Sequence, residues 1–176
     1  MKPTTKKSTS ITPHLTVRDV AQAAKFYEAA LGFSTKLLLP GGPEGKIMHA
    51  EITHGSSSLM LGPESVARGI KAPITAGTTP PVSLYLNVED VDSAHAQAVK
   101  AGAIELLPPS DQFFGARTSI VCDLDGHQWM LAEHRTEVSE NAMKTKLTAA
   151  RLGAKSQGAE QTSKAPLGPI RRTHRV

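Results

Sequence analysis

Apolar and polar residues alternate along several short stretches of this chain and recur at helical spacing along two others. The alternation from residue 11 to 18 predicts a half-buried strand. Residues 20–31 instead place apolar side chains on one face of a helix, with Asp19 as the N-terminal cap and Gly32 as the terminator. Further strands are predicted at residues 33–39, 46–53 and 57–61. The first half therefore has the order β-α-β-β-β.

The second half repeats this order. A strand at 82–89, a helix at 91–101 behind the capping residue Asp90, and strands at 104–107, 118–123 and 127–133 are predicted, with a loop over 108–115. Leu15, Val17 and Asp19 recur as Leu86, Val88 and Asp90, each 71 residues later, and Leu59-Met60-Leu61 corresponds to Trp129-Met130-Leu131 at a shift of 70. Two matches at nearly one offset indicate a duplicated unit, and the surface that the two copies share is a natural place for a ligand.

The pattern divides the chain into six segments. We expect a disordered N-terminus (1–10), a first module (11–62), a linker with four prolines (63–81), a second module (82–134), a C-terminal helical extension (135–153) and a basic disordered tail (154–176).

Charge is distributed unevenly among these segments. Residues 11–140 hold nine Lys/Arg and fifteen Asp/Glu, whereas residues 141–176 hold eight Lys/Arg and one acid. The overall charge of +4 thus comes from basic ends on an acidic body, which argues against a specific nucleic-acid surface. Cys122 is the single cysteine, so no intrachain disulfide is expected. The sequence shows neither a membrane-length apolar run nor a signal peptide, and we expect a cytoplasmic protein.

Three groups of residues resemble a known family. They are Leu15-Thr16-Val17-Arg18-Asp19 with Phe26-Tyr27 and Leu31-Gly32-Phe33; Asp111-Gln112-Phe113-Phe114-Gly115 with Arg117; and Asp123-Leu124-Asp125-Gly126-His127-Gln128-Trp129. In this order they resemble the vicinal oxygen chelate (VOC) superfamily of glyoxalases, bleomycin-resistance proteins and extradiol dioxygenases, and most closely its PhnB-like branch. The resemblance implies an α+β fold in which two βαβββ modules form a cup-shaped sheet, usually in a homodimer.

The resemblance also implies where a divalent metal would be held in the cup. Active members supply one ligand from each of four strands, and these positions fall on Thr12, Met60, Ser83 and Met130. Hydroxyl and thioether groups are poor ligands for a hard cation, for which His and Glu side chains are suited. We therefore expect the metal site of the family to be missing here.

A relocated metal site is the alternative. His49 and Glu51 share one face of the predicted strand at 46–53, and His14 lies on the same face of the first strand as Thr12. Two imidazoles and one carboxylate would suit Zn, Ni or Fe. If no metal is bound there, we expect His14 to line a polar pocket and His49 and Glu51 to form a hydrogen-bonded pair.

Other side chains are candidate contacts to an organic ligand. Met60 and Met130 suit an apolar wall or a simple core role. Phe113 and Phe114 lie in a glycine-flanked loop and could cover a ligand or pack in a dimer. Arg117 could bind an anionic group or pair with Asp111.

Two classes of function follow from these residues. One is a protein that binds a small organic molecule without a metal, through His14, His49, Glu51, Met60, Phe113, Phe114, Arg117 and Met130. The other is a metal-dependent lyase or isomerase of the glyoxalase kind that uses His14, His49 and Glu51. Because function follows the site and not the fold, the poor ligands at the expected metal positions favour the first.

Overall fold

The structure is a computed structural model that describes residues 11–157; residues 1–10 and 158–176, both predicted to be disordered, lie outside the described part. The first module contains β1 (His14–Val17), α1 (Val20–Leu31), β2 (Ser34–Pro40), the short 3-10 helix η1 (Pro43–Gly45), β3 (Ile47–His54) and β4 (Ser57–Pro63). The second contains β5 (Ser83–Asn87), α3 (Val91–Lys100), β6 (Ile104–Asp111), β7 (Ala116–Cys122) and β8 (Gln128–His134). A short helix α2 (Pro73–Ala76) lies between the modules, and α4 (Glu140–Gln157) follows them.

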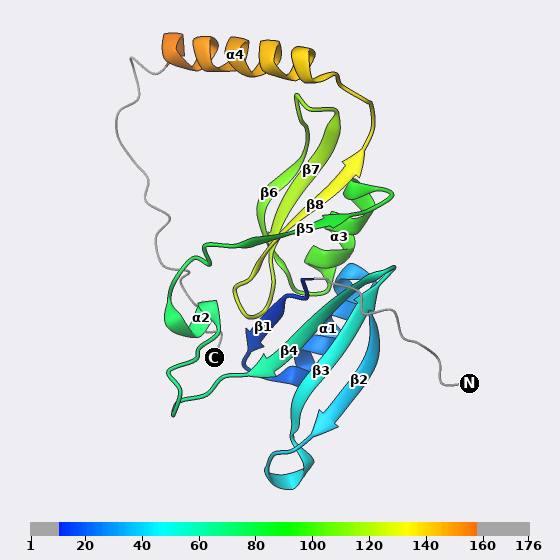
Figure 1. Cartoon of the computed structure of the whole chain (residues 1–176), viewed down its shortest axis with the longest axis vertical. Helices are drawn as coiled ribbons and strands as arrows, with labels where there is room; N and C mark the ends of the chain where they lie inside the picture. The colour runs from blue at the N-terminus through cyan, green and yellow to red at the C-terminus, as the bar shows by residue number, and fades with distance from the viewer. Residues whose placement is uncertain (1–10, 158–176) are drawn as a thin grey trace, which may run out of the picture.

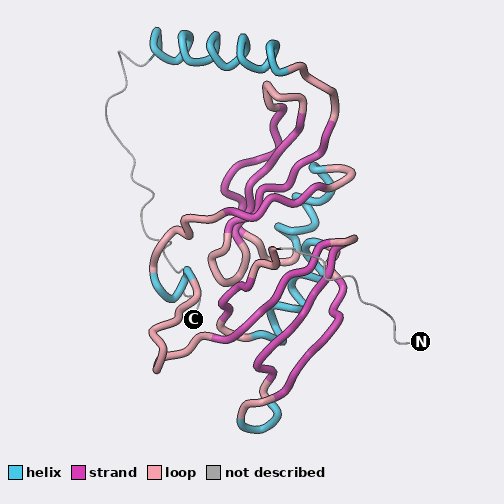
Figure 2. The backbone as a smooth tube through the Cα atoms, in the orientation of Figure 1, coloured by secondary structure: helices cyan, strands magenta, loops and turns pink. Residues whose placement is uncertain are grey.

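Each module forms its own four-stranded sheet. The strand orders are β1-β4-β3-β2 and β5-β8-β7-β6, and in both sheets the first strand runs parallel to the last while the other pairs are antiparallel. One face of each sheet is covered by the helix of its module, and α4 lies apart from both sheets (Figures 1 and 2). The prediction of an α+β fold with two βαβββ modules is confirmed.

The two main helices begin at the residues that the sequence indicates. The Asp19 side chain accepts a hydrogen bond from the Gln22 N–H, and Asp90 accepts from the N–H groups of Asp92 and Ser93. At the other end of α1, Gly32 adopts a φ of 69°, a left-handed conformation that costs glycine little.

The core lies where the helix-covered faces of the two modules meet. Helix α1 packs against α3, and the buried cluster contains side chains of both modules, among them Val17, Val20, Val91 and Leu131, each fully buried. The modules therefore share one hydrophobic core.

The structure differs from the sequence prediction mainly at irregular segments. β6 continues to Asp111 through two prolines that had been assigned to a loop, and its register with β7 shifts there. An edge strand tolerates proline because one side of its backbone needs no partner. The linker contains α2 and an isolated bridge between Ser65 and Ile70, and α4 extends to Gln157, beyond the predicted end of the helical extension. Among the described residues, no helix has both the length and the apolar character that crossing a membrane requires.

Candidate functional site

The face of each sheet that is turned away from its helix, here called the open face, carries most of the predicted site residues. Strand register aligns one row of side chains across each open face. The row is His14, Met60, Glu51 and Leu37 in the first sheet, and Tyr85, Met130, Ile120 and Leu107 in the second. Tyr85 and Leu107 are both 55% exposed. The duplicated fold thus presents two equivalent rows, of which only the first contains imidazole and carboxylate groups.

Two histidines approach each other on the first open face. His14 on β1 and His49 on β3 are separated by β4, yet their ring centroids lie 6.2 Å apart with planes only 18° from parallel. On β4, Met60 stands opposite His14 and Gly62 stands opposite Thr16, and a Cβ added at Gly62 would lie 2.6 Å from Cε1 of His14. The missing side chain at Gly62 therefore provides the space into which the His14 ring leans.

Glu51, the third residue of the alternative metal site, forms an ion pair with a lysine. Its carboxylate accepts a hydrogen bond of 3.0 Å from the Lys36 ammonium group on the neighbouring strand β2. Within residues 11–157, Asp90, Asp92 and Glu133 form the one group whose possible metal-ligand atoms all lie within 4.8 Å of one another. His14, His49 and Glu51 thus share one face but are not assembled into a compact three-ligand site.

The four positions that the family resemblance assigns to metal ligands are divided between the two sheets. Thr12 lies just before β1, and Met60 lies beside His14; Ser83 begins β5, and Met130 lies beside Tyr85. Together they offer two hydroxyl groups and two thioethers. This donor set does not fit a hard divalent metal, which prefers imidazole and carboxylate or water oxygen.

The two phenylalanines lie at the turn between β6 and β7. Their rings meet edge to face with centroids 5.3 Å apart, and Phe113 is 39% exposed. The backbone is tightly held behind them, because Gly115 has a φ of 87° and an added Cβ would lie 2.1 Å from the Thr136 carbonyl oxygen. The backbone of the turn is therefore held close to Thr136, while the Phe113 ring is exposed to solvent.

Arg117 is engaged by protein carboxylates. Its guanidinium donates two hydrogen bonds to Asp92, at 2.7 and 2.9 Å, and a third of 3.2 Å to Asp111. These hydrogen bonds raise the pKa of Arg117 and lower the pKa of Asp92. Pairing with Asp111 had been one of the two predicted roles. A ligand anion would have to compete with two carboxylates for this side chain.

A buried polar cluster between the modules was not foreseen. Asp123 accepts hydrogen bonds from the Tyr27 hydroxyl at 2.6 Å and from the Trp129 indole N–H at 3.1 Å. Burial, followed by the charge of Asp123, raises the pKa of Tyr27 well above 10.0. Trp129 is 3% exposed, as expected for a core residue. The hydrogen bond between Tyr27 and Asp123 could not be inferred from the sequence, because the two residues lie 96 positions apart and no local pattern pairs them.

Comparison with known proteins agrees with this architecture. The model of the Glyoxalase/Bleomycin resistance protein/Dioxygenase superfamily matches residues 9–131. The chain belongs to this superfamily.

Relatives of the chain are similar over most of their length. An uncharacterised protein of Mycobacterium tuberculosis, Rv0887c, is 35% identical over 133 residues, covering 74% of this chain and 77% of the relative. The crystal structure of PA1353 from Pseudomonas aeruginosa has a TM-score of 0.59 at 25% identity, covering 73% of this chain and 100% of that one. A PhnB protein from Bacillus cereus has a TM-score of 0.53 at 20% identity, covering 71% and 99%, and this likeness concerns the fold alone.

Proposed function

We propose that this member of the VOC superfamily binds a small organic molecule on the open faces of its sheets and does so without the metal site of the active family members. The observation that carries the proposal is the donor set at the four positions implied for the metal: Thr12, Met60, Ser83 and Met130 offer no imidazole and no carboxylate. A catalytic metal that polarises two neighbouring substrate oxygens would have no suitable ligands there.

The surroundings of these positions support an organic ligand. Met60 and Met130 are half-buried and adaptable in shape, and they lie beside His14 and Tyr85. The imidazoles of His14 and His49 and the Glu51 carboxylate add polar groups that could orient a bound molecule. Apolar walls with a few convergent polar groups are typical of sites for small molecules.

The proposal includes a cytoplasmic homodimer. Exposed apolar side chains lie on both outer strands, with Leu38 and Leu39 on β2 and Leu106 and Leu107 on β6 each between 36% and 55% exposed. Apolar surface on the outer strands of a sheet tends to be covered by another chain. A two-fold arrangement would use the same surface on both copies.

Metal analysis of the full chain tests the proposal. The purified protein, dialysed extensively and examined by inductively coupled plasma mass spectrometry, should hold far less than one equivalent of Zn, Ni or Fe. The same protein should gain no thermal stability from these ions, because a ligand stabilises the native state only when it binds that state.

The second candidate function is a metal-dependent lyase or isomerase, which the approach of His14 and His49 favours. Stoichiometric metal after dialysis, removed by His14→Ala or Glu51→Ala, would establish that function and overturn the metal-free proposal.

A further inference from the structure

The two modules are equivalent in fold, but the contacts between them are not equivalent. Strand register relates His14 to Tyr85 and Met60 to Met130, so the junction between β1 and α1 corresponds to the junction between β5 and α3. The turn between β7 and β8 docks onto the first junction. The turn between β3 and β4 faces the second, and there the structure has a cleft of about 650 Å³.

The first junction is filled by the turn of residues 123–127. Asp125 accepts hydrogen bonds from the backbone N–H of Arg18 at 3.0 Å and from its guanidinium at 2.8 Å. The His127 ring lies 2.9 Å from the carbonyl oxygen of Thr16. The Leu124 side chain is half-buried and lies against Gly102, which follows the helix of its own module, within 3.4 Å of a Cβ built there. The ion pair of Asp125 with Arg18 and the contact of His127 with Thr16 thus close this junction.

The second junction lacks an equivalent ion pair among the described residues. The turn from His54 to Ser57 is one residue shorter than the turn from Asp123 to His127, and Gly55 and Ser56 stand where the other turn has Leu124, Asp125 and Gly126. His54 lies against Gly32 much as Leu124 lies against Gly102, but no carboxylate from this turn reaches the cleft. The cleft therefore lies where the other half of the molecule has the contact between Asp125 and Arg18.

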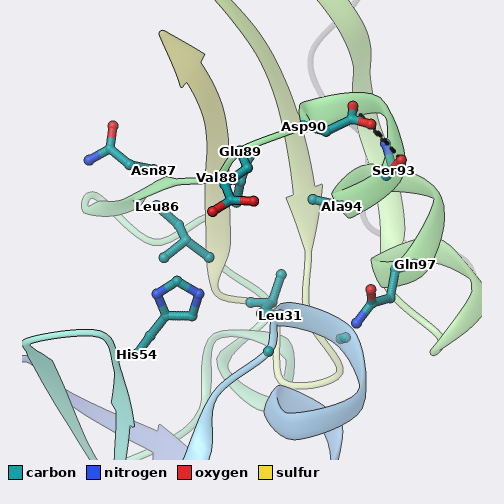
Figure 3. A pocket seen from close by; sticks show the side chains of 12 residues that line it. Leu31, His54, Leu86, Asn87, Val88, Glu89, Asp90, Ser93, Ala94 and Gln97 are labelled. Carbon is teal, nitrogen blue, oxygen red and sulfur yellow. Dashed lines mark hydrogen bonds between the residues drawn. The ribbon is translucent and has the colours of Figure 1, made fainter.

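The lining of the cleft defines what would fill it. Leu31, Leu86 and Val88 supply apolar surface from both modules, and the His54 ring, held at 5.4 Å from the ring of Phe33, forms one edge. Figure 3 shows the cleft bounded by His54 and Leu31 on one side and by β5 and α3 on the other, with the Glu89 carboxylate directed toward its interior.

The charge at this junction is reversed relative to the first. Glu89 occupies the position equivalent to Arg18, directly before the capping aspartate of the module helix. Arg18 is neutralised by Asp125, whereas Glu89 forms no ion pair with any residue in the range 11–157. The neighbouring carboxylate, Asp90, already accepts three hydrogen bonds at the start of α3. Glu89 is thus the group in the cleft that is available to a cation.

We propose that this cleft is a binding site for a small organic cation, in which a compact apolar body rests on Leu31, Leu86 and Val88 and an ammonium or amidinium group pairs with Glu89. The site is separate from the open faces of the sheets and does not depend on the function proposed for them. A charge-assisted hydrogen bond to Glu89 would select the cation, and the apolar walls would select its body.

The experiment uses the full chain and phenethylamine as the probe, with hydrocinnamate as an anion of similar size. Isothermal titration calorimetry should detect binding of phenethylamine and none of hydrocinnamate at the same concentrations. Glu89→Gln should weaken phenethylamine binding about tenfold or more, since it removes the charged partner. Glu137→Gln, at a side chain 95% exposed outside the cleft, is the matched control and should leave the affinity unchanged.

Two further variants test whether the amine binds in the cleft or is attracted only by the overall charge of the protein. Gln97 lines the cleft, and the equivalent position of α1 is Phe26. Gln97→Phe should therefore fill the cleft with an aromatic ring and abolish binding. Glu89→Arg should reverse the preference, so that hydrocinnamate binds and phenethylamine does not. Three results would overturn the proposal. They are equal binding of both probes, phenethylamine binding that persists in both Glu89→Gln and Gln97→Phe, and no binding of the amine to the unmodified chain at millimolar concentration.

Discussion

The hydroxyl group of Tyr27 donates a hydrogen bond of 2.6 Å to the carboxylate of Asp123, 96 residues further along the chain, and both groups are buried. Tyr27 comes from the helix of the first module, and Asp123 begins the turn of the second that contacts the junction of β1 and α1. Asp123 also accepts hydrogen bonds from the backbone N–H groups of Asp125 and His127. One carboxylate therefore fixes the shape of its own turn and ties that turn to the other module.

Removing the hydroxyl group should destabilise the protein measurably. Tyr27→Phe leaves a buried carboxylate oxygen with one donor fewer, which we expect to lower the free energy of unfolding by about 1–3 kcal/mol. Tyr85→Phe is the matched control because Tyr85 is 55% exposed, and it should change stability by no more than about 0.5 kcal/mol. Urea denaturation followed by tryptophan fluorescence measures both. Equal stability of the two variants would show that the buried hydrogen bond contributes nothing.

The same pair gives stability a dependence on alkaline pH. Burial raises the pKa of Tyr27 in the folded protein, so the unfolded chain loses this proton first as pH rises. The contribution of Tyr27 is therefore complete below pH 10 and is lost progressively above it. Between pH 8.5 and about 11, the urea midpoint of the wild type should fall more than that of Tyr27→Phe. Parallel curves for the two proteins would contradict this origin of the pH dependence.

The regular elements of the fold could be predicted because their signals are local. The helix at residues 20–31 was predicted with the bounds that the structure gives, since its first turn is capped by Asp19 and its end is marked by Gly32. The strand at 104–107 was predicted too short because two prolines normally signal a loop. Its place at the edge of a sheet, where prolines are tolerated, depends on long-range pairing.

The site could be predicted only in part for the same reason. Alternation identified which side chains of β1 and β3 share a face, but not which residues stand beside one another. Only the three-dimensional arrangement shows that the His14 ring leans over Gly62 and that the Lys36 ammonium group reaches Glu51 from the neighbouring strand. The cleft near Glu89 lies beside the turn between β3 and β4, which is one residue shorter than the turn between β7 and β8. The sequence alone does not show that this turn faces the second module, because that depends on how the two modules pack.

Filling the space at Gly62 should separate the two histidines without unfolding the protein. The Cβ of Gly62→Ala would lie 2.6 Å from Cε1 of His14, an exposed side chain that can turn away. We expect a stability change of no more than about 1 kcal/mol. The imidazole proton resonances of His14 and His49 should shift in NMR spectra, while that of His134, a mostly exposed side chain on β8, should not. Unchanged His14 and His49 resonances would contradict the stacked arrangement.

Association through the outer strands should be sensitive to a single charge. Leu107→Lys places an ammonium group on β6 at a position 55% exposed in the single chain, so it should prevent dimerisation without reducing monomer stability. Val66→Lys is the control because Val66 is 97% exposed in the segment between the modules. Multi-angle light scattering should give a dimer mass for the wild type and Val66→Lys and a monomer mass for Leu107→Lys. A monomeric wild type across micromolar concentrations would exclude the dimer.

A single carboxylate on the first open face should create the metal site that the wild type is proposed to lack. Met60 aligns with His14 on β1 and with Glu51 on β3, and His14 lies within 6.2 Å of His49, ring centroid to ring centroid. Met60→Glu therefore adds a carboxylate beside two imidazoles, a donor set that suits Zn or Ni. Met130→Glu is the matched control, because its neighbours in the equivalent row, Tyr85 and Ile120, are not metal ligands of this kind. In competition with a chromophoric chelator, Met60→Glu should bind Zn at least tenfold more tightly than either the wild type or Met130→Glu, and adding His14→Ala should remove the gain. Equal affinities for Met60→Glu and Met130→Glu would mean that the pair of histidines cannot converge on one ion.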